Sequence, residues 1–99
     1  MTATTHDLFA NLVEGHTYQV STSRDGLGGT RWQLMRYQRF DGELVWLQVA
    51  TCTSATPEDG RYRDTARGWL RSLGHNPDEM DLILILPDGI ERSTAAVGS

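Results

Sequence analysis

Arginine and aromatic side chains recur in the middle of the chain, where together they could form a binding surface. Arginine, tyrosine and tryptophan dominate the energetic centres of protein–protein interfaces. The same groups stack on bases and hold phosphates in proteins that bind single-stranded nucleic acid. Neither chemistry requires a cofactor or a metal ion. The residues that carry this pattern are Arg31, Met35, Tyr37, Arg39 and Trp46.

A tight turn must bring these residues together. Asp41-Gly42 separates two long runs of strand-forming residues. This dipeptide is a strong hairpin signal because both of its residues tolerate positive φ. If the loop contains only these two residues, Tyr37 lies directly opposite Trp46. We therefore predict a long hairpin over about residues 30–52.

This register gives the predicted hairpin two different faces. One face is apolar and is expected to lie in the core, and it carries Trp32, Leu34, Phe40, Val45, Leu47 and Val49. The other adds Leu44 to the five residues that carry the pattern, and we call it the aromatic–arginine face. Its guanidinium groups and rings would be available to a partner only if no other part of the chain covers them.

A short helix is predicted near the N-terminus, where Thr4 or Thr5 can cap it and Gly15 can end it. Its apolar residues fall on one side of the helix, and they are Leu8, Phe9, Leu12 and Val13. These side chains need a surface to pack against. The helix would therefore either cover the aromatic–arginine face or close one end of the sheet.

A second helix is predicted over about residues 61–73, with Gly74 as its cap. Its apolar stripe consists of Tyr62, Ala66, Trp69, Leu70 and Leu73. We expect this stripe to pack on the apolar face of the hairpin. Gly68 lies inside the helix and costs about 1 kcal/mol relative to alanine unless it permits a close approach to the sheet.

The remaining predicted elements are a strand over 17–23, a helical turn over 76–79, a buried strand over 81–86 and an edge strand over 90–92. This order predicts a small α+β domain. It has a mostly antiparallel sheet of four or five strands, one main amphipathic helix packed on one face and a short N-terminal helix. We assign residues 1–92 to this single domain and residues 93–99 to a flexible C-terminal tail.

Every basic side chain outside the three histidines is an arginine, since the chain contains no lysine, and the net charge is −4. Residues 24–71 carry eight arginines against six acidic residues, whereas residues 72–99 carry one arginine against five. This balance lacks the strong basic excess that is typical of nucleic-acid-binding proteins. It favours a protein partner over nucleic acid, which stays an alternative.

Two further charged clusters suggest other partners. Arg63, Arg67 and Arg71 recur every fourth residue along the second helix and could contact phosphates, although such spacing is also typical of a solvated helix face. The nucleic-acid alternative combines this arginine ridge with the aromatic–arginine face. An acidic cluster surrounds strand 81–86 and could make the protein an inhibitor that mimics nucleic-acid charge. Its members are Asp78, Glu79, Asp81, Asp88 and Glu91.

No catalytic signature accompanies these clusters. Cys52 is the only cysteine, and the three histidines have no metal-ligand spacing. The glycine-rich segment 25–30 lacks the lysine and the following helix of a phosphate-binding loop, so it predicts a hairpin loop. We expect no cofactor and no metal ion, with a small enzyme of unknown type as an alternative.

The sequence therefore predicts a small non-enzymatic interaction or regulatory protein that binds a protein partner through the aromatic–arginine face. The longest apolar run, 82–86, is far too short to span a membrane, and residues 1–13 do not resemble a secretory signal. We accordingly expect a cytoplasmic protein with no membrane contact. Its oligomeric state is expected to be monomer or homodimer.

Overall fold

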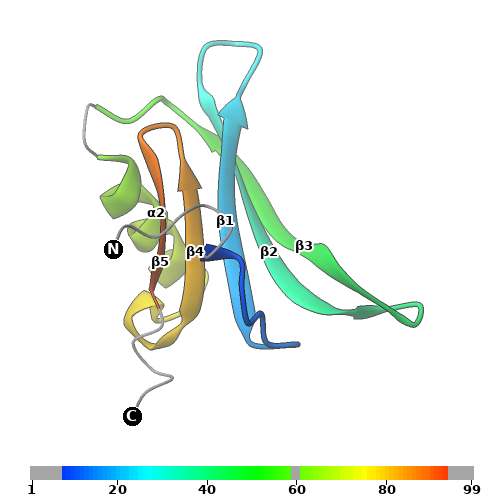
Figure 1. The fold of residues 1–99 in the computed structure, drawn as a ribbon. Coiled ribbons are helices and arrows are strands. Elements are labelled where there is room, and N and C mark those ends of the chain that lie inside the picture. The colour runs from blue at the N-terminus through cyan, green and yellow to red at the C-terminus, as the bar shows by residue number, and fades with distance from the viewer. Residues whose placement is uncertain (1–7, 59–60, 94–99) are drawn as a thin grey trace.

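The computed structural model describes residues 8–58 and 61–93. Within these residues, five strands form one sheet and one α-helix packs on it (Figure 1). The elements are β1 (Thr17–Arg24), β2 (Thr30–Phe40), β3 (Glu43–Ser54), α2 (Tyr62–Ser72), the 3-10 turn η1 (Pro77–Glu79), β4 (Asp81–Leu86) and β5 (Gly89–Ser93). The predicted strands, main helix and helical turn are confirmed, with small differences at their ends.

The sheet has the strand order β3-β2-β1-β4-β5. Strands β1, β2 and β3 form an antiparallel meander, and β4 and β5 form a second antiparallel pair. β4 lies parallel to β1, which makes the sheet mixed. The expected mostly antiparallel sheet is confirmed, with this one parallel pair as the exception. The exception arises because the chain reaches β4 through the helical crossover α2 and not through a hairpin.

The predicted hairpin register is correct over its outer half. Asp41 and Gly42 form the turn, both at positive φ (53° and 86°), and the pairing then follows the two-residue loop as far as Met35 opposite Gln48. The register shifts by one position before Leu34, which lies opposite Ala50. This bulge was not predicted, and it leaves Val49 as the extra residue of β3.

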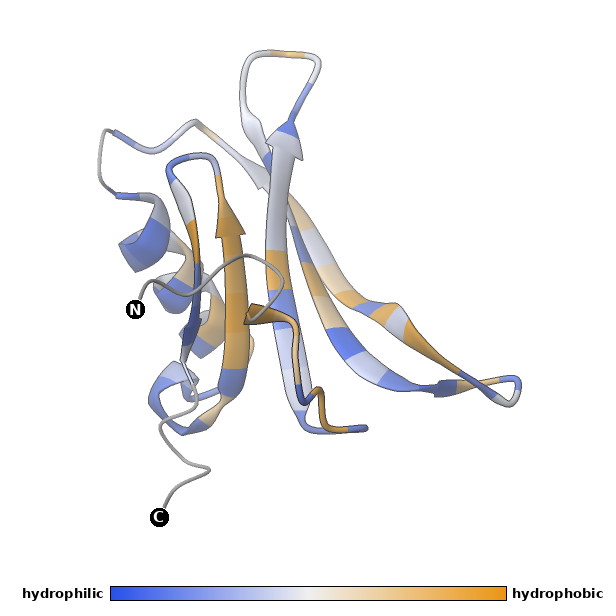
Figure 2. Ribbon diagram, viewed as in Figure 1, coloured by the Kyte–Doolittle hydropathy of each residue, from blue (hydrophilic) through white to orange (hydrophobic). Residues whose placement is uncertain are grey.

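The core lies between α2 and one face of the sheet, and its buried members are Val20, Trp32, Leu34, Ala66, Leu70, Met80, Leu82 and Leu84. Trp32 is central to it, with ring centroids 6.3 Å from Tyr62 and 6.4 Å from Trp69. Its indole N–H donates a hydrogen bond to Ser54 Oγ at 2.9 Å. Figure 2 shows that hydrophobic residues concentrate along β4 in the middle of the molecule.

Part of the predicted apolar hairpin face lies outside this core. Phe40 is 61% exposed and Val49 is 44% exposed, while Val45 and Leu47 are only half-buried. Phe40 and Val45 lie where the hairpin continues past the start of β1, beyond the core cluster beneath α2. Val49 is the extra residue at the bulge of the edge strand β3. The expectation that they belong to the core was therefore wrong, whereas Trp32 and Leu34 confirm it.

The end of α2 also differs in detail from the prediction. Gly74 follows the helix at φ 92°, as its role in capping requires. Leu73 is 41% exposed because it lies beyond the last helical residue, so it does not extend the apolar stripe into the core. A Cβ atom at Gly68 would meet no atom within 4 Å, which rules out a close approach to the sheet at this position.

The structure does not show the N-terminal helix that was predicted from Thr4 or Thr5 to Gly15. The start of this predicted helix lies outside the described residues. Residues 9–16 form turns, bends and irregular chain. Their backbone groups bond to the rest of the fold, since the Val13 N–H donates to Thr17 Oγ1 at 2.8 Å. Figure 1 shows this segment in front of the sheet, on the side opposite α2.

A buried ion pair joins this segment to the sheet. Two guanidinium nitrogens of Arg92 each donate to a carboxylate oxygen of Asp81 at 2.9 Å, and Thr17 Oγ1 donates to Asp81 at 2.6 Å. Asp81 is only 5% exposed. The remaining guanidinium N–H groups donate to the carbonyl oxygens of Leu8, Ala10 and Asn11. One network therefore connects β1, β4, β5 and the chain before β1.

The network changes the acidity of its carboxyl group. Burial acts to raise the pKa of Asp81, but hydrogen bonds from Arg92 and Thr17 and the charge of Arg92 outweigh it. The pKa therefore lies below its ordinary value of 3.8. The stabilisation that the carboxylate provides is present above about pH 4 and is lost as the pH falls through the lowered pKa.

Replacing Asp81 by Asn should destabilise the fold by about 3–5 kcal/mol, because it leaves the Arg92 guanidinium buried without its counter-charge. Urea unfolding at pH 7 measures this loss, and unfolding of the native chain between pH 7 and pH 2 should show the acid limb that D81N lacks. The double variant D81N/R92M should recover part of the stability. Equal stability of D81N and the native chain would contradict this assignment.

Gly68→Ala should stabilise the protein by about 1 kcal/mol, since Gly68 lies in an exposed helix interior with open space around the added methyl group. Gly29→Ala is the matched control, because its Cβ would lie 2.5 Å from the backbone oxygen of Ser54. We expect that variant to be less stable than the native chain. Thermal unfolding of both variants tests the pair, and a lower melting temperature for G68A would refute the prediction.

Candidate functional site

The β2–β3 hairpin projects beyond the rest of the sheet on the side of its turn (Figure 1). The paired residues of β1 and β2 end with Tyr18 opposite Arg36, and one more hydrogen bond joins the Gly15 N–H to the Tyr37 carbonyl oxygen at 2.6 Å. We call residues 37–46 the hairpin arm. Its two strands pair with each other, and no other strand of the described chain pairs with them.

The aromatic pair that the sequence predicted lies on this arm. Tyr37 and Trp46 are directly opposite each other, with ring centroids 5.3 Å apart and planes inclined by 57°. Alternation along β2 places Tyr37 on the face opposite Trp32 and therefore away from α2. Both rings are half-buried, and Leu44 beside them is 42% exposed. This pair forms an amphipathic surface that faces away from the core.

The arginines of the predicted face are not all near this pair. Arg39 is two residues from Tyr37 on the same face of β2. It donates to the Gly42 carbonyl oxygen at 3.1 Å and lies 3.4 Å from Glu14, with both side chains about half-exposed. Arg31 is six residues from Tyr37, which is about 20 Å along an extended strand. The structure thus groups Arg39 with the aromatic pair and places Arg31 at the far end of β2, with Met35 between them.

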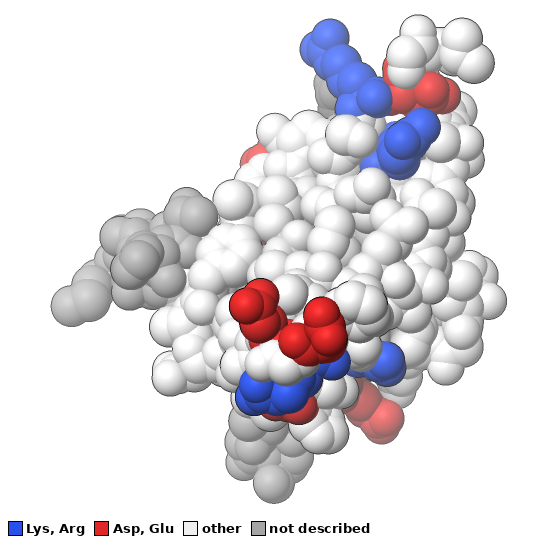
Figure 3. Space-filling view, turned by 90° about the vertical axis from the view of Figure 1, so that its right-hand side faces the viewer, with Lys and Arg blue, Asp and Glu red and all other residues white. Residues whose placement is uncertain are grey.

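The outer edge of β3 adjoins the arm. β3 is the terminal strand of the sheet and has twelve residues, and no charged residue occurs between Glu43 and Glu58. Figure 3 views this side of the molecule, where charged side chains gather at the two ends and a broad uncharged area lies between them. Free sheet edges usually carry charges that prevent pairing with other chains. The uncharged run was visible in the sequence, but its position at an edge was not.

The predicted arginine ridge lies elsewhere. Arg63, Arg67 and Arg71 are on α2, which packs on the sheet face opposite Tyr37 and Trp46. Arg63 contacts Glu91 at 2.9 Å, and Arg67 forms an ion pair with Asp78. Two of the three guanidinium groups therefore already have carboxylate partners. The ridge and the aromatic–arginine face do not form one continuous surface.

The acidic cluster around β4 is largely neutralised by the same contacts. Asp78 pairs with Arg67, Glu91 pairs with Arg63, and Asp81 is buried against Arg92. Asp88 and Glu79 are exposed. Three of the five carboxylates thus have an arginine partner, which weakens the resemblance of this surface to the regular charges of a nucleic acid.

In the part of the chain that the structure describes, the remaining candidate groups do not assemble into a reactive centre. Burial raises the pKa of the Cys52 thiol, which favours the unreactive protonated form. His75 packs against the Tyr18 ring at 5.4 Å. Within residues 8–58 and 61–93, no three His, Cys, Asp or Glu side chains gather closely enough to hold a metal ion. In the same part of the chain, no helix has the length and apolar character needed to cross a membrane.

Comparisons of the chain with protein-family models, with curated proteins and with solved structures gave no match.

The Tyr37–Trp46 contact should contribute about 0.5–1.5 kcal/mol to stability beyond the area that it buries. Urea unfolding of Y37A, W46A and the double variant measures this coupling energy. A second cycle that combines Y37A with Leu27→Ala is the control, because Leu27 is 94% exposed in the loop between β1 and β2. That pair should be additive. Additivity of Y37A and W46A themselves would show that the two rings do not interact.

Proposed function

We propose that this chain is a small non-enzymatic interaction protein that binds a protein partner through the outer face of the hairpin arm. The surface consists of Tyr37, Arg39, Leu44 and Trp46. The partner is expected to present apolar side chains and a carboxylate that competes with the exposed Glu14 for Arg39. Regulation of that partner is the role that such a small binding protein would have.

One observation carries this proposal: the half-buried Tyr37–Trp46 pair lies beside the uncharged free edge of β3, on an arm that no other strand covers within the described chain. Aromatic rings beside an arginine are typical of interface centres. The edge of β3 can also add backbone hydrogen bonds to an extended segment of the partner. The wide uncharged area on this side of the molecule (Figure 3) favours a protein over a phosphate backbone.

The alternatives have weaker support. Nucleic-acid binding would have to use the aromatic–arginine face and the α2 ridge together, yet these lie on opposite faces of the sheet. The proposed charge mimicry would use carboxylates of which three already have arginine partners. For the enzyme alternative, the described residues do not bring an acid, a base and a nucleophile together in one place.

A quantitative affinity capture with the immobilised full chain tests the proposal. A partner should be recovered by the native chain and should be lost, by about tenfold or more, with W46A and with R39A. Two control variants remove exposed groups of the same kind away from the arm: L27A removes an apolar side chain and R71A removes an arginine. Both controls should retain the partner. Binding must then be repeated with the purified partner.

Undiminished binding by correctly folded W46A and R39A would reject the surface. Retention of a labelled single-stranded oligonucleotide, with an affinity that falls steeply with salt and is reduced by R71A, would instead favour the nucleic-acid alternative.

A further inference from the structure

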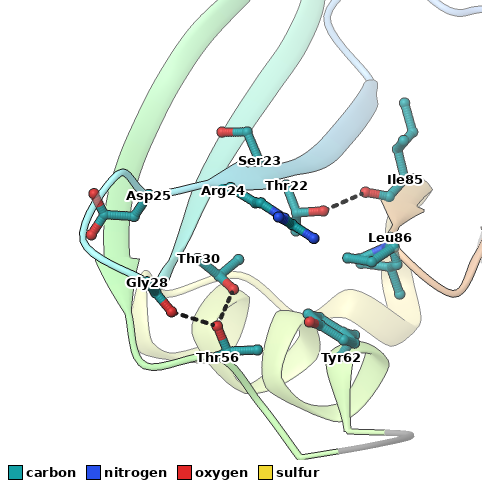
Figure 4. Close-up of a pocket in the computed structure, with 12 residues that line it drawn as sticks. Thr22, Ser23, Arg24, Asp25, Gly28, Thr30, Thr56, Tyr62, Ile85 and Leu86 are labelled. Atoms are coloured by element: carbon teal, nitrogen blue, oxygen red, sulfur yellow. Dashed lines mark hydrogen bonds between the residues drawn. The ribbon is translucent and has the colours of Figure 1, made fainter.

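A cavity of about 560 Å³ opens at the end of the sheet opposite the arm. It lies where the carboxyl ends of the parallel strands β1 and β4 are side by side, with the start of α2 beneath them (Figure 4). Ligands of α/β proteins commonly bind outside the carboxyl ends of neighbouring parallel strands. The volume is within the range of small-molecule sites.

The hydroxyl hydrogens of the three threonines in the cavity are already used in hydrogen bonds within the protein. Thr22 donates to the Ile85 carbonyl oxygen at 3.3 Å, and Thr56 donates to the Gly28 carbonyl oxygen at 3.2 Å. Thr30 and Thr56 are 3.3 Å apart. Because each hydroxyl has one proton, Thr30 must be the donor in that contact. These three oxygens can therefore accept hydrogen bonds from a ligand, but they cannot donate to one.

The donors that face the cavity are Arg24 and Tyr62. Figure 4 shows the Arg24 guanidinium pointing into the cavity, while the carboxylate of the adjacent Asp25 points away from it. None of the ion pairs formed by the described residues involves Arg24. Tyr62 lies across the cavity from Arg24 and carries a phenol O–H. Two donors, one of them charged, and no facing carboxylate indicate a site for an anionic group.

The N-terminus of α2 has no side-chain cap, but Asp64 in its first turn offsets part of the positive charge of the helix end. The Arg24 guanidinium is therefore the main positive charge of the site. On the other side of the cavity, Leu86 and Pro87 provide an apolar wall. The loop between β1 and β2 borders the cavity, and hydrogen bonds hold it in place. The Asp25 N–H donates to the Gly29 carbonyl oxygen at 2.9 Å, and Thr56 donates to the Gly28 carbonyl oxygen.

We infer that this cavity binds a small organic anion, a carboxylate or a phosphate ester, whose charged group accepts hydrogen bonds from Arg24 and Tyr62. An apolar part of the same molecule lies against Leu86 and Pro87. Hydroxyl or amino groups of the ligand donate to the threonine oxygens. This site is separate from the hairpin arm, and its existence does not depend on the proposed protein partner.

Titration of the isotope-labelled full chain, followed by amide chemical shifts at constant ionic strength, tests the inference. Benzoate and phenyl phosphate are the anionic probes, and benzyl alcohol is the uncharged probe of similar shape. At least one anion should shift the amides of Arg24, Thr30, Thr56 and Tyr62 in a saturable manner. A preference for benzoate identifies a carboxylate site, and a preference for phenyl phosphate identifies a phosphate site.

Variants decide whether the named donors are responsible. Arg24→Gln should weaken binding by about tenfold or more, since it removes a charged donor, and Y62F should weaken it by a smaller factor. Arg71→Gln removes an exposed arginine at the other end of α2 and should leave the affinity unchanged. The inference is overturned if neither anion saturates, if benzyl alcohol binds as tightly as the anions, or if R24Q and R71Q have equal effects.

Discussion

The hydrogen-bonded contact of Asp81 with Arg92 and Thr17 fixes the first strand, β1, and the last strand, β5, to β4, which lies between them. Thr17 is the first residue of β1, Asp81 is the first residue of β4, and Arg92 lies in β5, so one buried carboxylate aligns three strands at the same end. The guanidinium of Arg92 also binds three carbonyl oxygens of the segment before β1. Because these groups satisfy one another, the ion pair can be buried without leaving an uncompensated charge.

This alignment explains why both candidate sites lie at the ends of β1. β1 has eight residues, whereas β2 and β3 have eleven and twelve. At the start of β1 the longer hairpin continues without a neighbouring strand beside β2, so the arm that carries Tyr37 and Trp46 projects from the sheet. At its other end, β1 finishes beside its parallel neighbour β4 and above the first residue of α2, which leaves the cavity around Arg24. A longer β1 would pair with β2 along the arm, and an antiparallel β4 would remove the cavity.

The strands and the helix could be predicted from the sequence because each of them depends on residues that are close together in the chain. Asp41-Gly42 predicted the turn and the Tyr37–Trp46 pairing, and the helical spacing of Tyr62, Ala66 and Leu70 predicted α2 and its buried side. The bulge at Val49 and the parallel pairing of β4 with β1 depend on contacts between distant segments, so no local pattern indicated them. The cavity was missed for the same reason, since Arg24, Thr56 and Leu86 meet only after the crossover has formed.

Amide hydrogen exchange of the free chain, followed residue by residue, tests the central claim that the arm lies outside the stable part of the fold. The amides of Val20, Leu34 and Leu84 should exchange most slowly, because they belong to the strands of the buried core. The amides of the arm, from Tyr37 to Trp46, should exchange much faster. Slow exchange that extends evenly along the hairpin to its turn would show that another part of the molecule covers the arm, and it would contradict this account.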